Sequence, residues 1–216
     1  NNSTHLVYRN SNNDQLEYAS NLNGWNIVTI GASGKAVSKS HSAIWLPNGD
    51  LAIGLIDFDG KIDSDSGETY NLTLKAKGGA ISVGGVIGST DNIGNLNINK
   101  DYDDGTGKIT LSGVGASDKI GITGTVDVGH TGTASMDLAG SYYNIDGNTI
   151  FMTTGSADVI DIKAAQTIKT SNDDVSFVQG TIALDDDANL TIDAGTGTVT
   201  LTTIGAVHDE VIDITG

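Results

Sequence analysis

The acidic stretch DFDGKIDSDSGE, residues 57–68, comes closer to a chemical site than any other part of the sequence. Its carboxylates occupy positions 1, 3, 7, 9 and 12 of a twelve-residue window, and these offsets are typical of the oxygen ligands in an EF-hand calcium loop. The pattern is incomplete, because Ile62 occupies the position at which an EF-hand needs glycine. Clustered carboxylates nevertheless favour a hard cation. We therefore expect calcium as a candidate cofactor, with a solvated loop as the alternative, and the candidate ligands are Asp57, Asp59, Asp63, Asp65 and Glu68.

Both tryptophans lie in the first quarter of the chain, close in sequence to Tyr8 and Tyr18. Exposed aromatic faces can stack on sugar rings, so Trp25 and Trp45 are candidate carbohydrate-binding residues. The alternative is that these aromatic side chains form the core of a small β-domain.

Residue patterns typical of enzymes are missing from the sequence. The histidines His5, His41, His130 and His208 are scattered and have no spacing that suggests a zinc site. The sequence contains neither a GxSxG motif nor a dinucleotide fingerprint. A pair of carboxylates for glycoside hydrolysis is still an alternative, because acidic residues occur throughout the chain. We expect a protein that is not an enzyme and has no catalytic residues.

The charge balance limits the partners of the protein. The 216 residues include 27 acidic and 11 basic side chains, which gives a formal net charge of -16. Such a chain repels nucleic acid and anionic lipid surfaces. No apolar run approaches the roughly 18 residues that span a bilayer. We therefore expect no nucleic-acid partner and no membrane insertion of this segment.

The composition and patterning of the sequence change near residue 56. Residues 1–56 contain several short alternating runs, and in SAIWLPNGDLAIGLI the pair Asn48-Gly49 is a strong hairpin signal. This part is predicted to form about five short antiparallel strands, as a cap or a small aromatic-rich β-region. Residues 57–68 are predicted to be an acidic linker, and residues 69–216 a β-repeat region.

Related units recur beyond the acidic stretch. NLTLKAKGGAISVGGV, residues 71–86, aligns without gaps with NLTIDAGTGTVTLTTI, residues 189–204, and GKITLSGVG from Gly107 matches the later half. A second element follows these units as DNIG, DKIGITG, DVIDIKA and EVIDITG. Alternating strands of this kind can stack in parallel about 4.8 Å apart, so that each coil buries its Ile and Val side chains on the coil before it. The predicted fold is all-β, a β-solenoid of stacked repeats with a small antiparallel N-terminal region. An antiparallel β-sandwich is the alternative, since alternation with frequent turns also describes that class.

The units at residues 71–99, 107–124 and 189–216 resemble the repeats of large bacterial surface adhesins, the filamentous-haemagglutinin-like and related giant adhesins. This resemblance implies a right-handed β-helix or a related stack, export to the cell surface, and a role in adhesion, aggregation or biofilm. Residues 5–57 resemble one blade of a sialidase-like β-propeller, and DFDGKID resembles the DxDG calcium loops of extracellular repeat proteins.

Together these observations predict a non-enzymatic, extracellular structural or adhesive repeat protein of a bacterial cell surface. Its expected partners are other copies of itself or a cell-surface or glycan ligand. One alternative is a self-assembling subunit of an extracellular filament, joined by β-augmentation between subunits. A second alternative is a carbohydrate-binding module.

Overall fold

The computed structural model describes residues 56–216 apart from residues 77, 102–104, 156 and 206–208, and before residue 56 it describes the backbone of five strands. These five strands are antiparallel. Three form one sheet, β1 (His5–Asn10), β2 (Gln15–Ser20) and β3 (Asn26–Thr29), and two form a pair, β4 (Ala43–Trp45) and β5 (Leu51–Ile53). The prediction of about five short antiparallel strands in this part of the chain is confirmed, as is the pairing of the two runs that flank PNGD.

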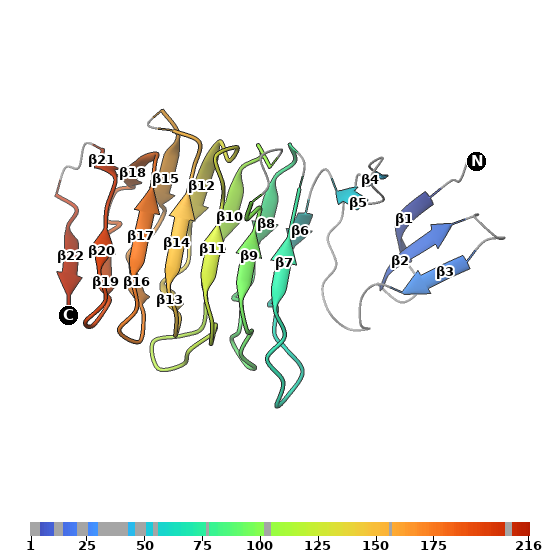
Figure 1. Cartoon of the computed structure of the whole chain (residues 1–216), viewed down its shortest axis with the longest axis horizontal. Coiled ribbons are helices and arrows are strands. Elements are labelled where there is room, and N and C mark those ends of the chain that lie inside the picture. The colour runs from blue at the N-terminus through green and yellow to red at the C-terminus, as the bar shows by residue number, and fades with distance from the viewer. Residues whose placement is uncertain are drawn as a thin grey trace.

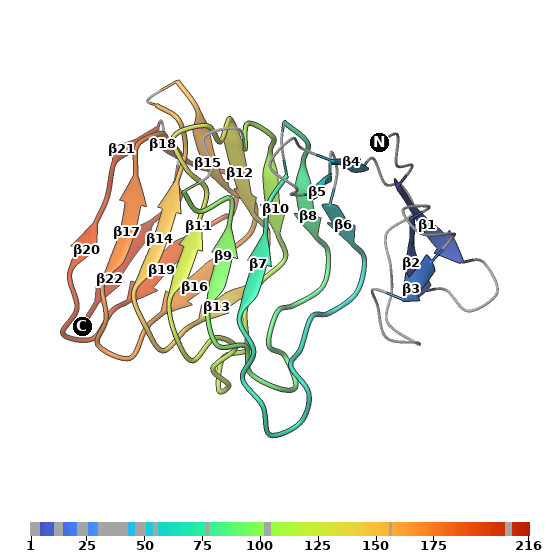
Figure 2. The ribbon, with the colours of Figure 1, turned by 45° about the vertical axis from the view of Figure 1, so that its right-hand side comes forward.

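From Ile56 onward the chain winds into a parallel β-solenoid of about six coils. Each coil adds one strand or bridge to each of three sides in turn, and Figures 1 and 2 show the strands of successive coils side by side along the stack. The predicted β-solenoid is confirmed, and the parallel pairing rules out an antiparallel sandwich for this part of the chain. The stack includes much of residues 57–68, because β6 pairs with β8, Ile62 bridges Ile87, and the Ser64 N–H donates to the Asp91 carbonyl.

Three parallel sheets form the sides of the solenoid. The seven-stranded sheet consists of β6 (Ile56–Phe58), β8 (Ile81–Val83), β10 (Ile109–Leu111), β12 (Ser135–Leu138), β15 (Val159–Ile162), β18 (Thr181–Leu184) and β21 (Thr203–Ile204). The six-stranded sheet consists of β7 (Leu72–Leu74), β9 (Leu96–Ile98), β11 (Val126–Val128), β14 (Thr149–Met152), β17 (Val175–Val178) and β20 (Val199–Thr200). The four-stranded sheet consists of β13 (Tyr142–Asn144), β16 (Gln166–Lys169), β19 (Leu190–Asp193) and β22 (Ile212–Thr215), and isolated parallel bridges continue this side through the earlier coils.

The core is a set of apolar rows that run along the solenoid axis. Successive side chains of a strand point to opposite faces, so alternate residues of each strand point inward. One row of register partners consists of Ile56, Ile81, Ile109, Met136, Ile160, Ile182 and Ile204, and every member between the two ends of this row is fully buried. Burying each such side chain contributes about 1.5–3 kcal/mol. Stacking of equivalent residues therefore stabilises the array, whereas a single coil has nothing to cover its apolar faces.

Three aromatic rings fill the middle of the solenoid. Phe151 and Phe177 are register partners in the six-stranded sheet, with ring centroids 5.4 Å apart. Tyr143 meets Phe151 edge to face at 6.1 Å. The buried Tyr143 hydroxyl donates to the Leu111 carbonyl at 2.8 Å and accepts from the Gly140 N–H at 3.2 Å. The polar end of this ring is therefore satisfied inside the core.

A ladder of polar side chains runs along the corner before the six-stranded sheet. The Asn71 Oδ1 accepts the Asn95 N–H of the next coil at 2.8 Å, and the Asn95 Oδ1 accepts the Thr125 N–H at 2.8 Å. The same arrangement returns in the later coils, where the Asn148 Oδ1 accepts the Asp174 N–H at 2.9 Å. These side chains satisfy backbone donors that the turns leave outside the strand ladders.

The coils differ in length because the earlier ones carry longer loops. The register partners Ile81 and Ile109 lie further apart in the sequence than the equivalent pair Ile160 and Ile182 in the later coils. At one corner the coils approach so closely that a Cβ on Gly107 would collide with the Gly79 carbonyl of the preceding coil. This close approach explains why the corner needs glycine.

The gap-free match between residues 71–86 and 189–204 does not identify equivalent positions. Leu72 begins β7 in the six-stranded sheet, but Leu190 begins β19 in the four-stranded sheet. Likewise, DVIDIKA forms β15 and EVIDITG forms β22, in different sheets. The match at GKITLSGVG is correct, since Ile109 pairs with Ile81 and Leu111 with Val83. All three sides need the same strand-and-corner pattern, so sequence similarity does not specify the side.

The part of the chain that the structure describes is free of helices, and it accordingly has no helix able to cross a bilayer.

Candidate functional site

The acidic residues predicted to bind calcium are spread over much of the first coil. Asp57 faces outward on β6, and Asp59 follows this strand. Asp63 comes directly after Ile62, whose bridge to Ile87 lies on another side of the solenoid. The remaining two, Asp65 and Glu68, lie exposed in the loop that leads to β7.

Asp63 is the member of this group with the best-defined contacts. Its carboxylate forms a 2.9 Å ion pair with the Lys61 ammonium and accepts the Thr90 N–H of the next coil at 2.9 Å. Burial alone raises the pKa of Asp63. The hydrogen bonds from Thr90, Lys61 and Asp91 and the charge of Lys61 outweigh this effect and hold the pKa below its usual value. Asp63 therefore ties the first coil to the second as a carboxylate.

The structure does not bring the predicted ligands into one cluster. Across residues 56–216, outside the few positions that the structure leaves undescribed, no three His, Asp or Glu side chains converge on a common point. Calcium binding by the acidic stretch stays a prediction. The predicted carbohydrate residues Trp25 and Trp45 lie where no side chains are described, so carbohydrate binding by them stays a prediction.

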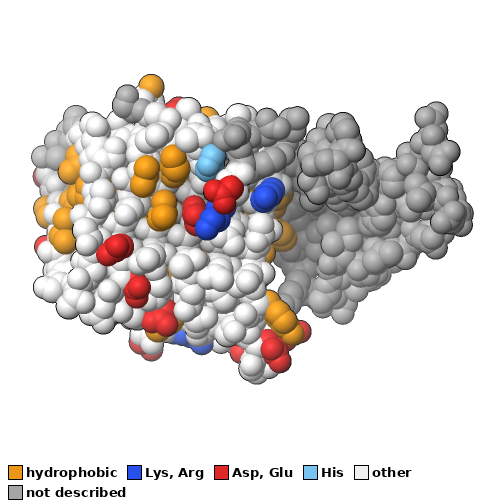
Figure 3. Space-filling view, in the orientation of Figure 1, with side chains coloured by type: hydrophobic (Ala, Val, Ile, Leu, Met, Phe, Trp, Pro, Cys, Tyr) orange, Lys and Arg blue, Asp and Glu red, His pale blue; other side chains and the backbone are white. Residues whose placement is uncertain are grey.

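Acidic and basic side chains on the outer faces form ion pairs, some between successive coils and some within one coil. The Lys108 ammonium lies 2.6 Å from an Asp137 carboxylate oxygen, and the Lys100 ammonium lies 3.2 Å from Asp127. Lys163 contacts Asp161 at 2.6 Å, and the hydrogen bond to this carboxylate is the main reason that the pKa of Lys163 is raised. Much of the face shown in Figure 3 consists of uncharged polar groups and backbone, with acidic side chains scattered over it. Exposed pairs of this kind contribute little to stability.

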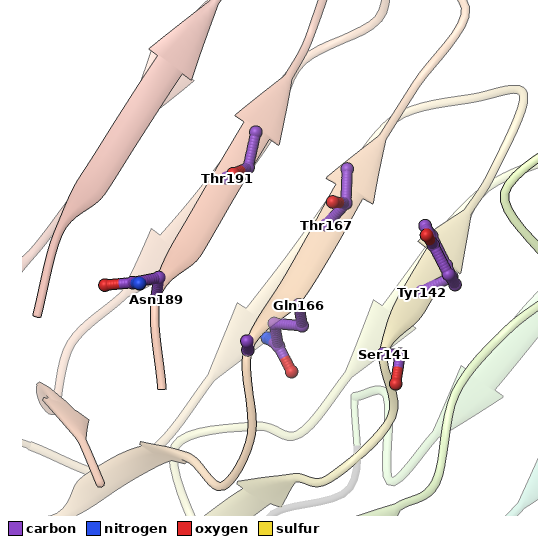
Figure 4. Close-up of a pocket in the computed structure, with 7 residues that line it drawn as sticks. Ser141, Tyr142, Gln166, Thr167, Asn189 and Thr191 are labelled. Atoms are coloured by element: carbon purple, nitrogen blue, oxygen red, sulfur yellow. The ribbon is translucent and has the colours of Figure 1, made fainter. Parts of the chain in front are cut away.

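A shallow groove of about 200 Å³ lies on the four-stranded sheet. Tyr142, Thr167 and Thr191 are register partners on β13, β16 and β19, and Figure 4 shows them as a row across these three strands. The Gln166 side chain is buried beneath the surface, while Ser141 and Asn189 lie at the edge of the groove. The Asn189 Oδ1 accepts the Val211 N–H at 2.7 Å, which fixes its amide.

Sequence reasoning did not identify this groove. The row depends on the register that places Tyr142 beside Thr167 and Thr167 beside Thr191 in successive coils. These residues come together only because their segments fall on the same side of successive coils. No local sequence motif indicates on which side of the solenoid a segment lies.

The last coil of this sequence leaves apolar side chains uncovered. Ile204 and Ile214 continue buried core rows, but they are 45% and 51% exposed, and nearby Val211 is 55% exposed. Their strands, β21 and β22, are the terminal strands of their sheets, as is β20. We call the surface formed by Ile204, Val211 and Ile214 the end face.

Comparison of the chain with models of protein families, with curated proteins and with solved structures finds no match. The stacked parallel architecture is compatible with adhesin-like repeats. The adhesin resemblance and the propeller-blade resemblance both stay predictions.

Proposed function

We propose that this protein is a non-enzymatic, extracellular repeat protein of a bacterial cell surface, with a structural role in attachment or biofilm formation. The observation that carries this proposal is the continuous parallel stack, in which one apolar core runs through about six coils. Each further coil of such a stack adds about 4.8 Å of length without needing a new kind of contact. Repetition of this unit is an economical way to build a stalk.

The surface, in which acidic side chains are scattered among uncharged polar groups, fits this role. A net charge of -16 keeps stacked rods from associating side by side and from collapsing onto anionic surfaces. The chain has no cysteine, so its coils are held by packing and hydrogen bonds and need no oxidation to fold.

Retention of protein-coated beads under flow tests this proposal. Beads that carry the folded protein should be held on a biofilm-coated surface under shear that removes beads carrying the heat-unfolded chain. Equal retention of the two kinds of bead would contradict an adhesive role. Circular dichroism of the bead-coupled stock checks that the first sample is folded.

A second candidate function is a subunit of an extracellular filament, in which copies of the stacked solenoid join end to end. In this function the occupant of the end face is a second copy of the chain, which adds its own strands to β20, β21 and β22 by β-augmentation. Covering Ile204, Val211 and Ile214 would remove from water the apolar area that these exposed side chains present.

Sedimentation velocity over a hundredfold range of concentration tests the filament function. Linear oligomers should appear as the concentration rises, and Ile214→Lys should abolish them because it places a charge in the contact. Tyr70→Lys is a matched control, because Tyr70 is 59% exposed and lies in the first coil, far along the chain from the end face. Monomers at every concentration would reject the filament function and leave the stalk function standing.

A further inference from the structure

The groove on the four-stranded sheet presents an aromatic ring that the core does not use. Tyr142 is 41% exposed, whereas its neighbour Tyr143 points into the solenoid and is fully buried. Adjacent strands are about 4.8 Å apart, so the ring lies beside the Thr167 side chain of the next coil. An exposed ring of this size offers a flat apolar face at little cost in side-chain entropy.

The other groups of the groove are hydrogen-bonding but uncharged. Hydroxyl groups come from Ser141, Thr167 and Thr191, and an amide group comes from Asn189, whereas the Gln166 amide is buried beneath the groove. All the residues that line the groove are neutral, although the chain carries 27 acidic side chains. The groove therefore has no cation to hold a phosphate or carboxylate, and no anion to hold a metal or an amine.

A flat ring beside several neutral hydrogen-bonding groups matches the chemistry of a sugar. A pyranose has an apolar face of C–H groups, which can lie on the Tyr142 ring, and a rim of hydroxyls, which can exchange hydrogen bonds with the threonine hydroxyls and the Asn189 amide. Nucleobases also stack on aromatic rings, but their phosphates would be repelled by the net charge of -16. We propose that this groove is a binding site for a neutral glycan.

The shape of the groove further limits the ligand. Its volume of about 200 Å³ is smaller than that of pockets that enclose a drug-sized molecule, and its lining residues come from three successive coils. One sugar unit can occupy it while the rest of an extended chain lies over β13, β16 and β19. Such a site binds a single unit weakly and gains strength from repeated contacts along a polymer.

The proposal does not depend on the attachment function, because a lateral glycan site and a stacked stalk are separate properties of the surface and the core. It also differs from a carbohydrate site at Trp25 and Trp45. The probes should therefore be an array of neutral and acidic oligosaccharides, with isothermal titration against the best neutral one, using the full chain.

Tyr142→Ala and Tyr70→Ala form a matched pair of variants, since each removes an exposed tyrosine ring and only the first ring lines the groove. Wild-type protein should bind at least one neutral glycan. Tyr142→Ala should weaken this binding at least tenfold, Thr167→Val should weaken it several-fold, and Tyr70→Ala should leave it unchanged. Unaltered melting temperatures would show that the variants are folded.

Three results would overturn the proposal. One is that the protein binds none of the neutral glycans on the array, and another is that it binds acidic glycans only. The third is binding that Trp25→Ala and Trp45→Ala abolish but Tyr142→Ala leaves intact, because that result would place the site in the N-terminal region.

Discussion

Asn95 lies directly above Asn71 in the stack, and both its main-chain N–H and its side-chain Nδ2 donate to the Asn71 Oδ1, at 2.8 and 3.0 Å. The Asn95 Oδ1 in turn accepts the Thr125 N–H and Thr125 Oγ1 of the following coil, at 2.8 and 3.1 Å. A single side chain thus links three consecutive coils at a corner where the strand ladders are interrupted.

This relationship predicts the effect of Asn95→Ala. The variant loses the hydrogen bonds of the Asn95 side chain, and the free energy of unfolding should fall by about 1–2 kcal/mol. Urea denaturation monitored by circular dichroism measures this change. Asn97→Ala is the control, because Asn97 lies in the middle of β9 on its outward-facing row and should cost less than about 0.5 kcal/mol. Equal losses in the two variants would show that the corner ladder does not stabilise the stack.

The buried hydroxyl of Tyr143 gives a second prediction. Tyr143→Phe leaves the buried Gly140 N–H without its partner and removes one of the two donors to the Leu111 carbonyl, which keeps the Ala139 N–H, so the free energy of unfolding should fall by about 1–3 kcal/mol. Tyr142→Phe makes the same chemical change on the neighbouring exposed ring and should leave stability nearly unchanged. Thermal unfolding of the two variants in parallel gives the comparison, and a larger effect for Tyr142→Phe would contradict the assignment of inward and outward faces.

The lowered pKa of Asp63 predicts a dependence of stability on pH. A carboxyl whose pKa is lower in the folded state than in the unfolded chain stabilises the fold above the unfolded pKa of about 3.9, and this contribution is lost as the pH falls through the folded pKa. Between about pH 5 and pH 3, wild-type stability should therefore fall more steeply than that of Asp63→Asn. Urea midpoints across this range measure the slopes. Parallel curves for wild type and Asp63→Asn would count against the Asp63 contacts.

The predicted calcium site has its own test. If residues 57–68 hold Ca²⁺, millimolar calcium should raise the melting temperature, because a ligand that binds only the folded state stabilises it. The rise should be smaller for a double variant, Asp59→Asn with Asp65→Asn, and Mg²⁺ should not replace Ca²⁺. An unchanged melting temperature at millimolar calcium would contradict calcium binding by residues 57–68.

The sequence predicted the architecture because the core of a solenoid repeats locally. Ile81 and Val83 were correctly matched with Ile109 and Leu111, since each pair occupies the same place in successive coils. Alternation and glycine-rich corners were enough to identify stacked strands.

The side of the solenoid on which each strand lies, which we call the phase of the coils, could not be predicted in the same way. Asn71 and Asn189 directly precede strands of nearly identical sequence, yet the first strand, β7, lies in the six-stranded sheet and the second, β19, lies in the four-stranded sheet. Loops of different lengths change the sequence spacing between strands of the same sheet. The alternation of residues within a strand does not reveal these loop lengths. The groove at Tyr142 depends on this phase, which is why local motifs pointed to the acidic stretch and the tryptophans instead.

The central claim is that successive coils are stacked in parallel with one strand per coil on each side. One outward-facing row of the seven-stranded sheet contains Asp57 on β6, Asp137 on β12 and Ala183 on β18. Counted from Asp57, Asp137 is three strands along the sheet and Ala183 is five strands along. The chain has no cysteine, so pairs of spin labels can be placed at these positions without background. Pulsed electron spin resonance should give mean separations of about 14 Å for residues 57 and 137 and about 24 Å for residues 57 and 183, from a spacing of about 4.8 Å per coil. Separations that do not increase with the number of coils between the labels would contradict the stacked solenoid.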